Sequence, residues 1–428
     1  MVFFYQRFIN LNYRVKNIQN RFLKRNGKED KKRIKEMKYD FDRIIDRSGT
    51  GSWKWKNGDA MLPMWVADMD FETCPSVKEA LQKRVSHGIY GYTALGENWY
   101  QAYMSWWKER HGFAIEKDWL VFVTGVIPAV SSAVRTLTNP GENVVIQTPV
   151  YPQFFESILN NDRNLLENQL LYDRESSSYR IDWEDLEKKL SDPKTTLMVL
   201  CNPQNPSGNI WDKETLQRIG DLCYKNHVIV VSDEIHCDLL APGYGYTPFA
   251  SVSDINKKIS VTCIAPTKTF NIAGIKTAAI VVPDKEIRHK MWLRINTDES
   301  AEGNCFSGIA AESAFTKEGG EWLDALREYV FENRRIAEEF IGKNIPSLRV
   351  IPSDATYLMW IECSDITDDA DQFVDFLEKE AKLMLNSGVD FGGNGKRFVR
   401  MNLACPRSMV EDGLNRLLKG VRAKEEKK

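Results

Sequence analysis

Short apolar runs alternate with stretches of helical periodicity in the central part of the chain. Six runs stand out, at residues 120–123, 143–146, 197–200, 228–231, 259–264 and 278–282. Apolar runs of this length are typical of strands that are buried on both faces of a parallel sheet. Because helical stretches separate the runs, the pattern predicts an α/β domain with a large, doubly wound, mostly parallel sheet.

Towards both ends the pattern changes to that of a smaller domain. Beyond about residue 325, strand-like segments alternate with amphipathic helices, and near the other end an aromatic-rich segment leads into a predicted helix at 75–85. This mixture predicts an α+β fold. We therefore expect a large domain over residues 85–324 and a smaller α+β domain formed by both chain ends, residues 37–84 plus 325–428.

The first 36 residues differ in composition from the rest. Residues 1–28 carry seven basic side chains and no acidic one. A signal peptide is disfavoured, because Arg7 interrupts an apolar run that is already too short. We interpret residues 1–36 as a basic N-terminal extension outside the core; an arm that binds nucleic acid is the alternative.

Composition and charge narrow the functional class. The chain has 58 basic and 60 acidic residues among 428, so its net charge of −2 gives no general signature of nucleic-acid or membrane binding. It has no apolar run of about 18 residues, which a spanning helix requires. The eight cysteines are scattered without a C-x-x-C pair, which favours reduced thiols, no metal site and a cytoplasmic protein.

Three polar segments follow three of the predicted strands. They are Asn-Pro-Gln-Asn-Pro-Ser-Gly at 202–208, Ser-Asp-Glu-Ile-His at 232–236 and Thr-Lys at 267–268. The carboxyl ends of parallel strands meet at one edge of the sheet, where open α/β sheets bind ligands. Lys268 is placed there to hold an aldehyde as a Schiff base, although a lone lysine near a loop is usually only a solvated charge.

The other two segments supply groups that suit a pyridoxal-phosphate ring. Asp233 ends a strand of β-branched residues, and a buried carboxylate is costly unless a cation such as a protonated pyridine nitrogen pairs with it. Asn205 lies between prolines, where its amide can be held towards the phenolic oxygen of the ring. The alternatives are ordinary: Asp233 as a helix N-cap and Asn205 as part of a simple turn.

Two further segments complete this cofactor hypothesis. Residues 121–129 read as strand, tight turn and helix start, which would leave the amides of Gly125, Val126 and Ile127 free to bind a phosphate. Tyr151 follows another predicted strand and could stack on the flat pyridine face, although a core tyrosine is equally plausible.

Taken together, these motifs resemble the fold-type I pyridoxal-phosphate enzymes of the class I/II aminotransferase group, and within it the MalY/PatB-like cystathionine β-lyases. The resemblance covers nearly all of residues 37–422. Its strongest parts are the segments 39–42, 64–71, 90–93, 148–151, 202–208, 232–236, 268–274 and 398–402.

This resemblance implies roles for several residues. Lys268 would carry the cofactor, Asp233 would pair with its ring nitrogen, Asn205 would contact its phenolic oxygen and Tyr151 would stack on it. Arg400 would hold the substrate carboxylate, because a planar guanidinium matches a carboxylate bidentately.

The resemblance also implies a homodimer and a substrate pocket. Tyr92 would reach the phosphate in the neighbouring subunit, so the active sites would lie at the dimer interface. Tyr357 and Tyr151 would belong to the substrate pocket.

The chain departs from the broader aminotransferase pattern at three positions. His236 stands where many members have a tyrosine that touches the phenolic oxygen, which is typical of the lyase branch. Ala265 replaces a phosphate-binding serine, and Lys276 replaces a phosphate-binding arginine. Thr267 and Lys276 are therefore the candidate phosphate ligands among the side chains.

The expected reaction is β-elimination from a cysteine S-conjugate. The amine of Lys268, displaced by the substrate amine, would remove the α-proton, and a thiolate would leave from Cβ. L-cystathionine would give homocysteine, pyruvate and ammonia. An aminotransferase of amino acids is the first alternative, and a protein that keeps this fold but regulates a transcription factor is the second.

Overall fold

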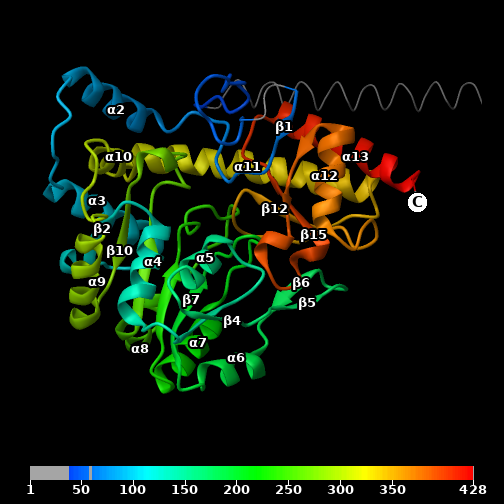
Figure 1. Ribbon diagram of the computed structural model, residues 1–428. Helices are drawn as coiled ribbons and strands as arrows, with labels where there is room; N and C mark the ends of the chain where they lie inside the picture. The colour runs from blue at the N-terminus through cyan, green and yellow to red at the C-terminus, as the bar shows by residue number, and fades with distance from the viewer. Residues whose placement is uncertain (1–37, 57–59, 428) are drawn as a thin grey trace, which may run out of the picture. The chain divides into compact units, whose positions relative to one another are not determined.

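The computed structural model describes residues 38–56 and 60–427 (Figure 1). Residues 44–428 form one compact unit, distinct from residues 1–43. In the first unit, the rings of Tyr39 and Phe41 lie 6.3 Å apart. Residues 1–36 lie outside the described part of the chain, so their interpretation as an extension stays a prediction. Everything below concerns the second unit.

A seven-stranded sheet forms the centre of the large α/β region. Its strand order is β2-β10-β9-β8-β7-β3-β4. The bounds are β2 Leu120–Val123, β10 Ala278–Val281, β9 Ser260–Ile264, β8 Ile229–Asp233, β7 Thr195–Cys201, β3 Asn143–Ile146 and β4 Asn164–Glu167. All neighbours are parallel except β10, which is antiparallel to both β2 and β9. The predicted mostly parallel, doubly wound sheet is confirmed.

Helices cover both faces of this sheet. One face packs on a core that includes α4, α5 and α9, and the other on a core that includes α6 and α7. Their bounds are α4 Val126–Leu137, α5 Gln153–Leu159, α6 Trp183–Leu190, α7 Lys213–Lys225, α8 Asp254–Lys258 and α9 Lys285–Thr297. Asp182 and Asp212 accept hydrogen bonds from the first turns of α6 and α7, which fixes where these helices begin.

A second, four-stranded antiparallel sheet is built from the C-terminal part of the chain. Its order is β11-β12-β15-β14, with bounds β11 Arg349–Val350, β12 Leu358–Glu362, β15 Phe398–Asn402 and β14 Asn386–Ser387. The helices α12 Ala370–Ala381 and α13 Arg407–Glu425 pack with it into one apolar cluster. The same cluster includes Leu62 and Met64 from near the other chain end.

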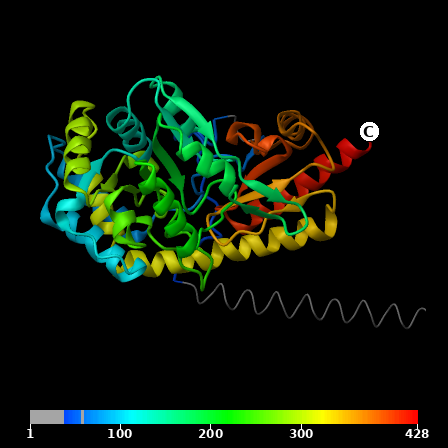
Figure 2. The same ribbon diagram turned by 90° about the horizontal axis from the view of Figure 1, so that it is seen from below.

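The remaining helices flank or connect the two sheets. They are α2 Pro75–His87, α3 Glu97–His111, α10 Ser307–Ala314 and the 28-residue α11 Lys317–Asn344. Figure 2 shows α11 running along the molecule past both sheets. Two small pairings complete the fold: β1 Leu62–Pro63 with β13 Leu383–Met384, and the hairpin of β5 Leu171–Asp173 and β6 Ser178–Arg180. The predicted domain boundaries stay a prediction.

Among the described residues, no helix has the length and apolar character needed to cross a bilayer.

Candidate active site

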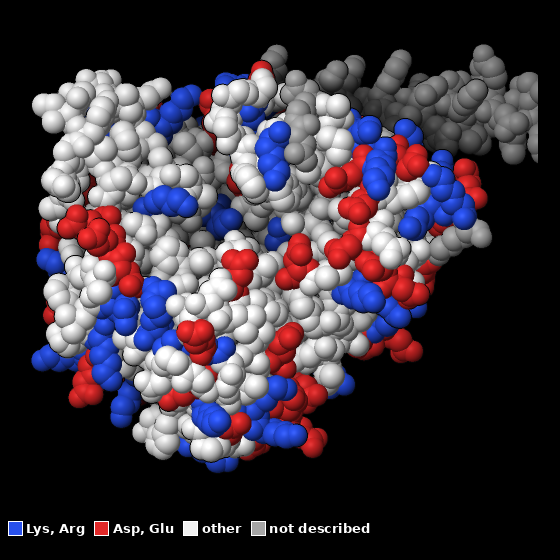
Figure 3. Space-filling view, in the orientation of Figure 1, with Lys and Arg blue, Asp and Glu red and all other residues white. Residues whose placement is uncertain are grey.

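A cavity of about 910 Å³ opens at the carboxyl ends of the central parallel strands, facing β15. In the space-filling view a hollow lies near the middle of this face, with Lys and Arg atoms visible inside it (Figure 3). All of the predicted site residues line this cavity except Tyr92 and Tyr357. The fold therefore brings together residues of both sheets that are more than 270 positions apart in the sequence, from Gly125 after β2 to Arg400 in β15.

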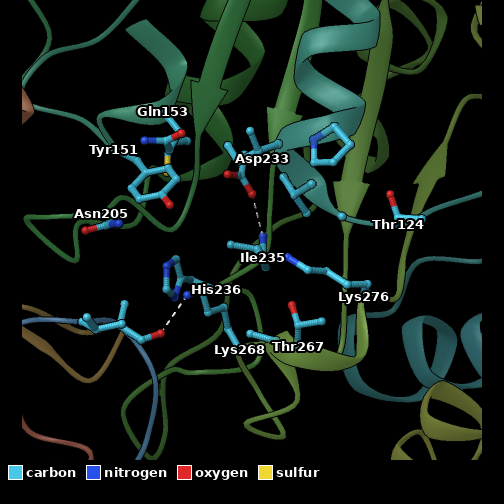
Figure 4. Close-up of a pocket in the computed structure, with 18 of the residues that line it drawn as sticks. Thr124, Tyr151, Gln153, Asn205, Asp233, Ile235, His236, Thr267, Lys268 and Lys276 are labelled. Atoms are coloured by element: carbon cyan, nitrogen blue, oxygen red, sulfur yellow. Dashed lines mark hydrogen bonds between the residues drawn. The ribbon is translucent and has the colours of Figure 1, made fainter. Parts of the chain in front are cut away.

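Lys268 reaches the cavity from the loop after β9. Its Nζ donates a hydrogen bond to the carbonyl oxygen of Ala67 at 2.7 Å (Figure 4). Burial and the nearby positive charge of Arg400 lower the pKa of Lys268 to about 8. Next to it, the buried Thr269 donates to the carboxylate of Asp238 at 3.1 Å, which anchors the loop from behind. The lysine is thus held in place and is easily deprotonated.

Asp233 ends β8 and is buried, with one carboxylate oxygen accepting from the backbone N–H of Ile235 at 3.0 Å. Burial raises the pKa of Asp233 to about 6, although the Ile235 N–H and the charge of Lys268 act in the opposite direction. Figure 4 shows this carboxylate turned into the cavity. Its protonation therefore depends strongly on whether a cation occupies the space in front of it.

Arg400 projects from β15 and is almost completely buried. Its Nη1 donates to the Asn205 side-chain oxygen at 2.9 Å, and its Nη2 donates to the Asn386 side chain and to the Trp65 carbonyl at 2.6 and 3.0 Å. Its buried Nε has no partner. Burial lowers the pKa of Arg400 to about 10. The guanidinium is therefore oriented in advance and keeps one donor for an anionic ligand.

His236 and Tyr151 form another side of the cavity. Burial, with the charges of Lys268 and Arg400, lowers the pKa of His236 to about 3, so its ring is neutral at physiological pH. Its buried Nδ1 has no partner. Burial raises the pKa of the half-buried Tyr151. Both rings can therefore contact a ligand without adding charge to the cavity.

One end of the cavity is suited to an anion. Helix α4 begins there at Val126, after Gly125, and no side chain caps its first turn. The first amides of a helix have no acceptor within the helix, so the amides of Val126 and Ile127 are available to a ligand. Thr267 and Lys276 line the same cavity and lie near one another, whereas Ala265 does not line it (Figure 4).

The segment 65–71 contributes peptide carbonyls to the site. Besides Lys268, the Tyr357 hydroxyl donates to the Ala67 carbonyl at 3.0 Å. The Asn402 amide donates to the carbonyls of Val66 and Asp68, both at 2.6 Å. Asn271 donates in the same way to Met69 and Phe71 at 3.0 and 2.8 Å. Side chains from both sheets thus fix one short stretch of backbone.

Two predicted residues lie elsewhere. Tyr357 is buried behind Ala67 and does not line the cavity, so its predicted contact with substrate stays a prediction. Tyr92 is fully exposed in a segment without regular structure between α2 and α3, and its role in a neighbouring subunit also stays a prediction.

The residues around the cavity fit a pyridoxal 5'-phosphate group. Asp233 offers a buried carboxylate without a paired cation, and the start of α4 offers amide donors beside Lys276. Lys268, whose pKa is lowered to about 8, lines the same cavity. Each of these features is unusual in a protein interior and is explained by one aromatic ligand that bears an aldehyde, a ring nitrogen and a phosphate.

Sequence reasoning missed several cavity residues. Gln153, Asn386, Glu302 and Asn304 line it, and no motif in the sequence marks them. Thr124 and Trp65 also line it; they lie in the segments 121–129 and 64–71 that the sequence indicates, but neither had a predicted role. Trp53 lines it as well, and only its aromatic character drew notice in the sequence.

Comparisons with known proteins agree with the fold. The chain is 42% identical over 383 residues to cystathionine β-lyase PatB of Bacillus subtilis (strain 168), covering 88% of this chain and 98% of that protein. It is 31% identical over 392 residues to protein MalY of Escherichia coli (strain K12), covering 90% and 99%.

The chain is also similar to a solved structure. The crystal structure of cystalysin from Treponema denticola, which contains a pyridoxal 5'-phosphate cofactor, superposes with a TM-score of 0.87 at 35% identity, covering 90% of this chain and 100% of that one. Residues 60–417 match the family described as aminotransferase class I and II. With the predicted sheet and the predicted cavity residues in place, the chain belongs to the aminotransferase class I and II family.

Proposed function

We propose that this protein is a pyridoxal-phosphate-dependent carbon–sulfur β-lyase that cleaves L-cystathionine or related cysteine S-conjugates to a thiol, pyruvate and ammonia. One observation carries the proposal: Lys268, Asp233 and Arg400 line one cavity, where burial shifts the pKa of each. The 42% identity to a protein named cystathionine β-lyase supports the choice of reaction.

Each side chain has a place around the cofactor. Lys268 would hold its aldehyde carbon, Asp233 its ring nitrogen and Asn205 its phenolic oxygen, with Tyr151 against the ring face and His236 beside it. The phosphate would lie at the start of α4, with Thr267 and Lys276. Bound pyridoxal phosphate supplies an electron sink that stabilises negative charge at the substrate Cα.

Arg400 orients the substrate. Its unpaired Nε, with a neighbouring nitrogen that exchanges one of its protein partners, can bind the substrate carboxylate bidentately. The three existing acceptors hold the guanidinium plane still, so little ordering is needed when the carboxylate arrives.

Lys268 moves the proton. With a pKa of about 8, a substantial fraction of its amine is neutral near physiological pH and can accept the α-proton. The electron pair of the Cα–H bond forms the Cα–Cβ double bond as the Cβ–S bond breaks and the thiolate leaves with its electrons. The remaining three-carbon enamine takes up a proton at Cβ, which protonated Lys268 can supply. One water then hydrolyses the resulting imine to pyruvate and ammonia.

Transamination is the second candidate, because the matched family is named for aminotransferases. The same lysine can move the proton in either reaction. Formation of pyruvate without an added keto acid separates the two, since elimination needs no amino-group acceptor.

We also propose a homodimer in which Tyr92 reaches the neighbouring active site. Its support is the exposed apolar character of this segment, where Ile89 and Tyr90 are also exposed. A cytoplasmic location is proposed too, because all eight cysteines are free and seven are buried.

The decisive experiment combines spectroscopy and product analysis. The purified protein should show the visible absorbance band of covalently bound cofactor, and L-cystathionine should yield pyruvate and thiol in equal amounts. Lys268→Ala should lose both the band and the activity, whereas Lys290→Ala, at an exposed lysine of α9, should keep both. A bound cofactor without pyruvate would reject the lyase in favour of transamination.

A further inference from the structure

The sequence Trp53-Lys54-Trp55-Lys56 has one buried and one exposed side in the structure. Lys54 is 1% exposed and its Nζ lies 2.6 Å from the Asp70 carboxylate, while the Trp55 indole donates to the other oxygen of Asp70 at 2.9 Å. Trp53 is 65% exposed, and Lys56 is exposed as well. The inward residues anchor the segment, and the outward residues are free to meet a ligand.

More than one ion pair anchors the segment 53–56. Arg47 adds ion pairs of 2.9 Å to Asp68 and 2.8 Å to Asp70, so two cations share two carboxylates. Burying such charges gives little net stability, because desolvation offsets the attraction, but it fixes geometry. The segment 53–56 is therefore held at one position against residues 68–70. These residues directly follow Ala67, whose carbonyl accepts a hydrogen bond from Lys268.

The outward side chains lie at the rim of the active-site cavity. Trp53 and Trp65 both line it, with ring centroids 6.4 Å apart. Lys56 places its Nζ 3.6 Å from the Trp53 ring centre and 5.4 Å from that of Trp65. The Trp65 indole donates to the Lys54 carbonyl, and the Trp65 carbonyl accepts from Arg400. This pair of rings is thus tied directly to the proposed carboxylate-binding residue.

The proposed function leaves Lys56 without a role. Lys276 serves the phosphate, Arg400 the substrate carboxylate and Lys268 the proton, while Asp233 and Glu302 are the acidic residues that line the cavity. Lys56 does not itself line the cavity, but its ammonium group is held over the rings of Trp53 and Trp65, which do. A long substituent that extends from the substrate sulfur towards this rim would meet apolar rings first and a positive charge at its end.

We propose that Trp53, Trp65 and Lys56 form a subsite for the S-substituent, and that it favours cysteine S-conjugates with an unbranched apolar stem and a terminal carboxylate. This inference rests on the proposed lyase function and names its substrate class. Aromatic faces bind the stem, and the ammonium group of Lys56 binds the carboxylate.

The test compares kcat/KM of the holoenzyme for S-carboxypropyl-, S-butyl- and S-methyl-L-cysteine. The wild-type protein should prefer them in that order. Lys56→Met should lower the ratio of S-carboxypropyl to S-butyl about two- to fivefold, the range of an exposed ion pair. Trp53→Ala should lower the ratio of S-butyl to S-methyl about three- to tenfold, the range of an aromatic contact. Lys188→Met, at an exposed lysine of α6, should keep the wild-type ratios.

Calorimetric binding of S-carboxypropyl- and S-butyl-L-cysteine to the Lys268→Ala protein supplied with pyridoxal 5'-phosphate, which this variant cannot bind covalently, provides a readout without turnover, with and without Lys56→Met. If no substrate releases thiol but the binding ratio still falls with Lys56→Met, the proposed function fails and the subsite stands. If thiol is released but neither ratio changes in the variants, the subsite is rejected and the lyase stands. An equal loss on all substrates together with dissociation of a dimer in Trp53→Ala would assign Trp53 to a subunit interface instead.

Discussion

Asp70 and Asp233 are both 4% exposed, yet their surroundings are opposite. Asp70 is surrounded by Lys54, Arg47 and Trp55; burial alone would raise its pKa, but these partners outweigh burial and lower it. Asp233 has one backbone N–H and no cation in contact, and burial raises its pKa to about 6. A buried carboxylate that is paired with protein cations supports the fold, whereas a buried carboxylate without a paired cation indicates a site for a ligand.

The largest effect should come from removing the charge of Asp70. Asp70→Asn removes the nearer of the two carboxylates that pair with the buried Lys54 and leaves Asp68 at 3.7 Å. Breaking such a buried pair costs about 3–5 kcal/mol of unfolding free energy. Urea denaturation of the variant measures this loss. The double variant Lys54→Met/Asp70→Leu should recover most of it, and a single variant as stable as the wild type would contradict the structural role.

Asp233→Asn should instead preserve stability and lower activity. It removes an unpaired buried charge, so unfolding free energy should stay equal or rise, while kcat/KM for cysteine S-conjugates should fall about hundred- to thousandfold because ring-nitrogen protonation is lost. Steady-state kinetics and denaturation on the same samples measure both quantities. Loss of stability together with full activity would reverse the roles given to Asp70 and Asp233.

The pH dependence of cofactor-free protein separates the two carboxylates further. Asp233 has a native pKa of about 6 against an ordinary value of 3.8, so the native state binds more protons than the unfolded state between these values. Its contribution to stability is therefore lost as pH rises from about 4 to 6, by at most about 3 kcal/mol. Asp233→Asn should remove this decline. For Asp70, whose pKa is lowered, the stability is lost as pH falls below 3.8.

The smallest effect should come from Asn402→Ala, which leaves every charge in place. Loss of its bonds to the Val66 and Asp68 carbonyls should let the Ala67 carbonyl shift from Lys268 and lower kcat about tenfold, a cost typical of misplaced catalytic groups. The pH profile of kcat should shift as well, because the environment of Lys268 changes. Asn415→Ala, at an exposed asparagine of α13, should change neither quantity.

The central sheet could be predicted because its strands carry their own signal. β2, β3, β7, β8, β9 and β10 coincide with apolar runs; the bounds of β2 and β3 are identical, and the others differ by one or two residues. The edge strand β4 was missed because it is only half-buried and has the sequence Asn-Leu-Leu-Glu. The antiparallel direction of β10 was also missed, since the direction of a strand follows from its connections rather than from its composition.

The site could be predicted where side chains carry the chemistry. Lys268, Asp233 and Asn205 lie at or just beyond the carboxyl ends of the neighbouring strands β9, β8 and β7, so topology alone places them together. The Ala67 carbonyl could not be predicted, because it lies in irregular structure, where no strand–turn–helix pattern marks a free peptide group as it does at Gly125. The burial of Lys54 was also beyond prediction, since its partner Asp70 lies 16 residues away in irregular structure.

The segment 65–71, whose carbonyls are held by side-chain hydrogen bonds, also fixes a distance within the site. Arg400 donates to the Trp65 carbonyl and Lys268 donates to the Ala67 carbonyl. These carbonyls are two peptide units apart, and this spacing helps to set the distance between the proposed carboxylate-binding guanidinium and the proposed proton-accepting amine. If Arg400 holds the substrate carboxylate and Lys268 accepts the α-proton, as proposed, an amino acid whose carboxylate is one carbon farther from its amine should react more slowly. The geometry that the proposed reaction requires is thus set by the backbone of this segment as well as by side chains.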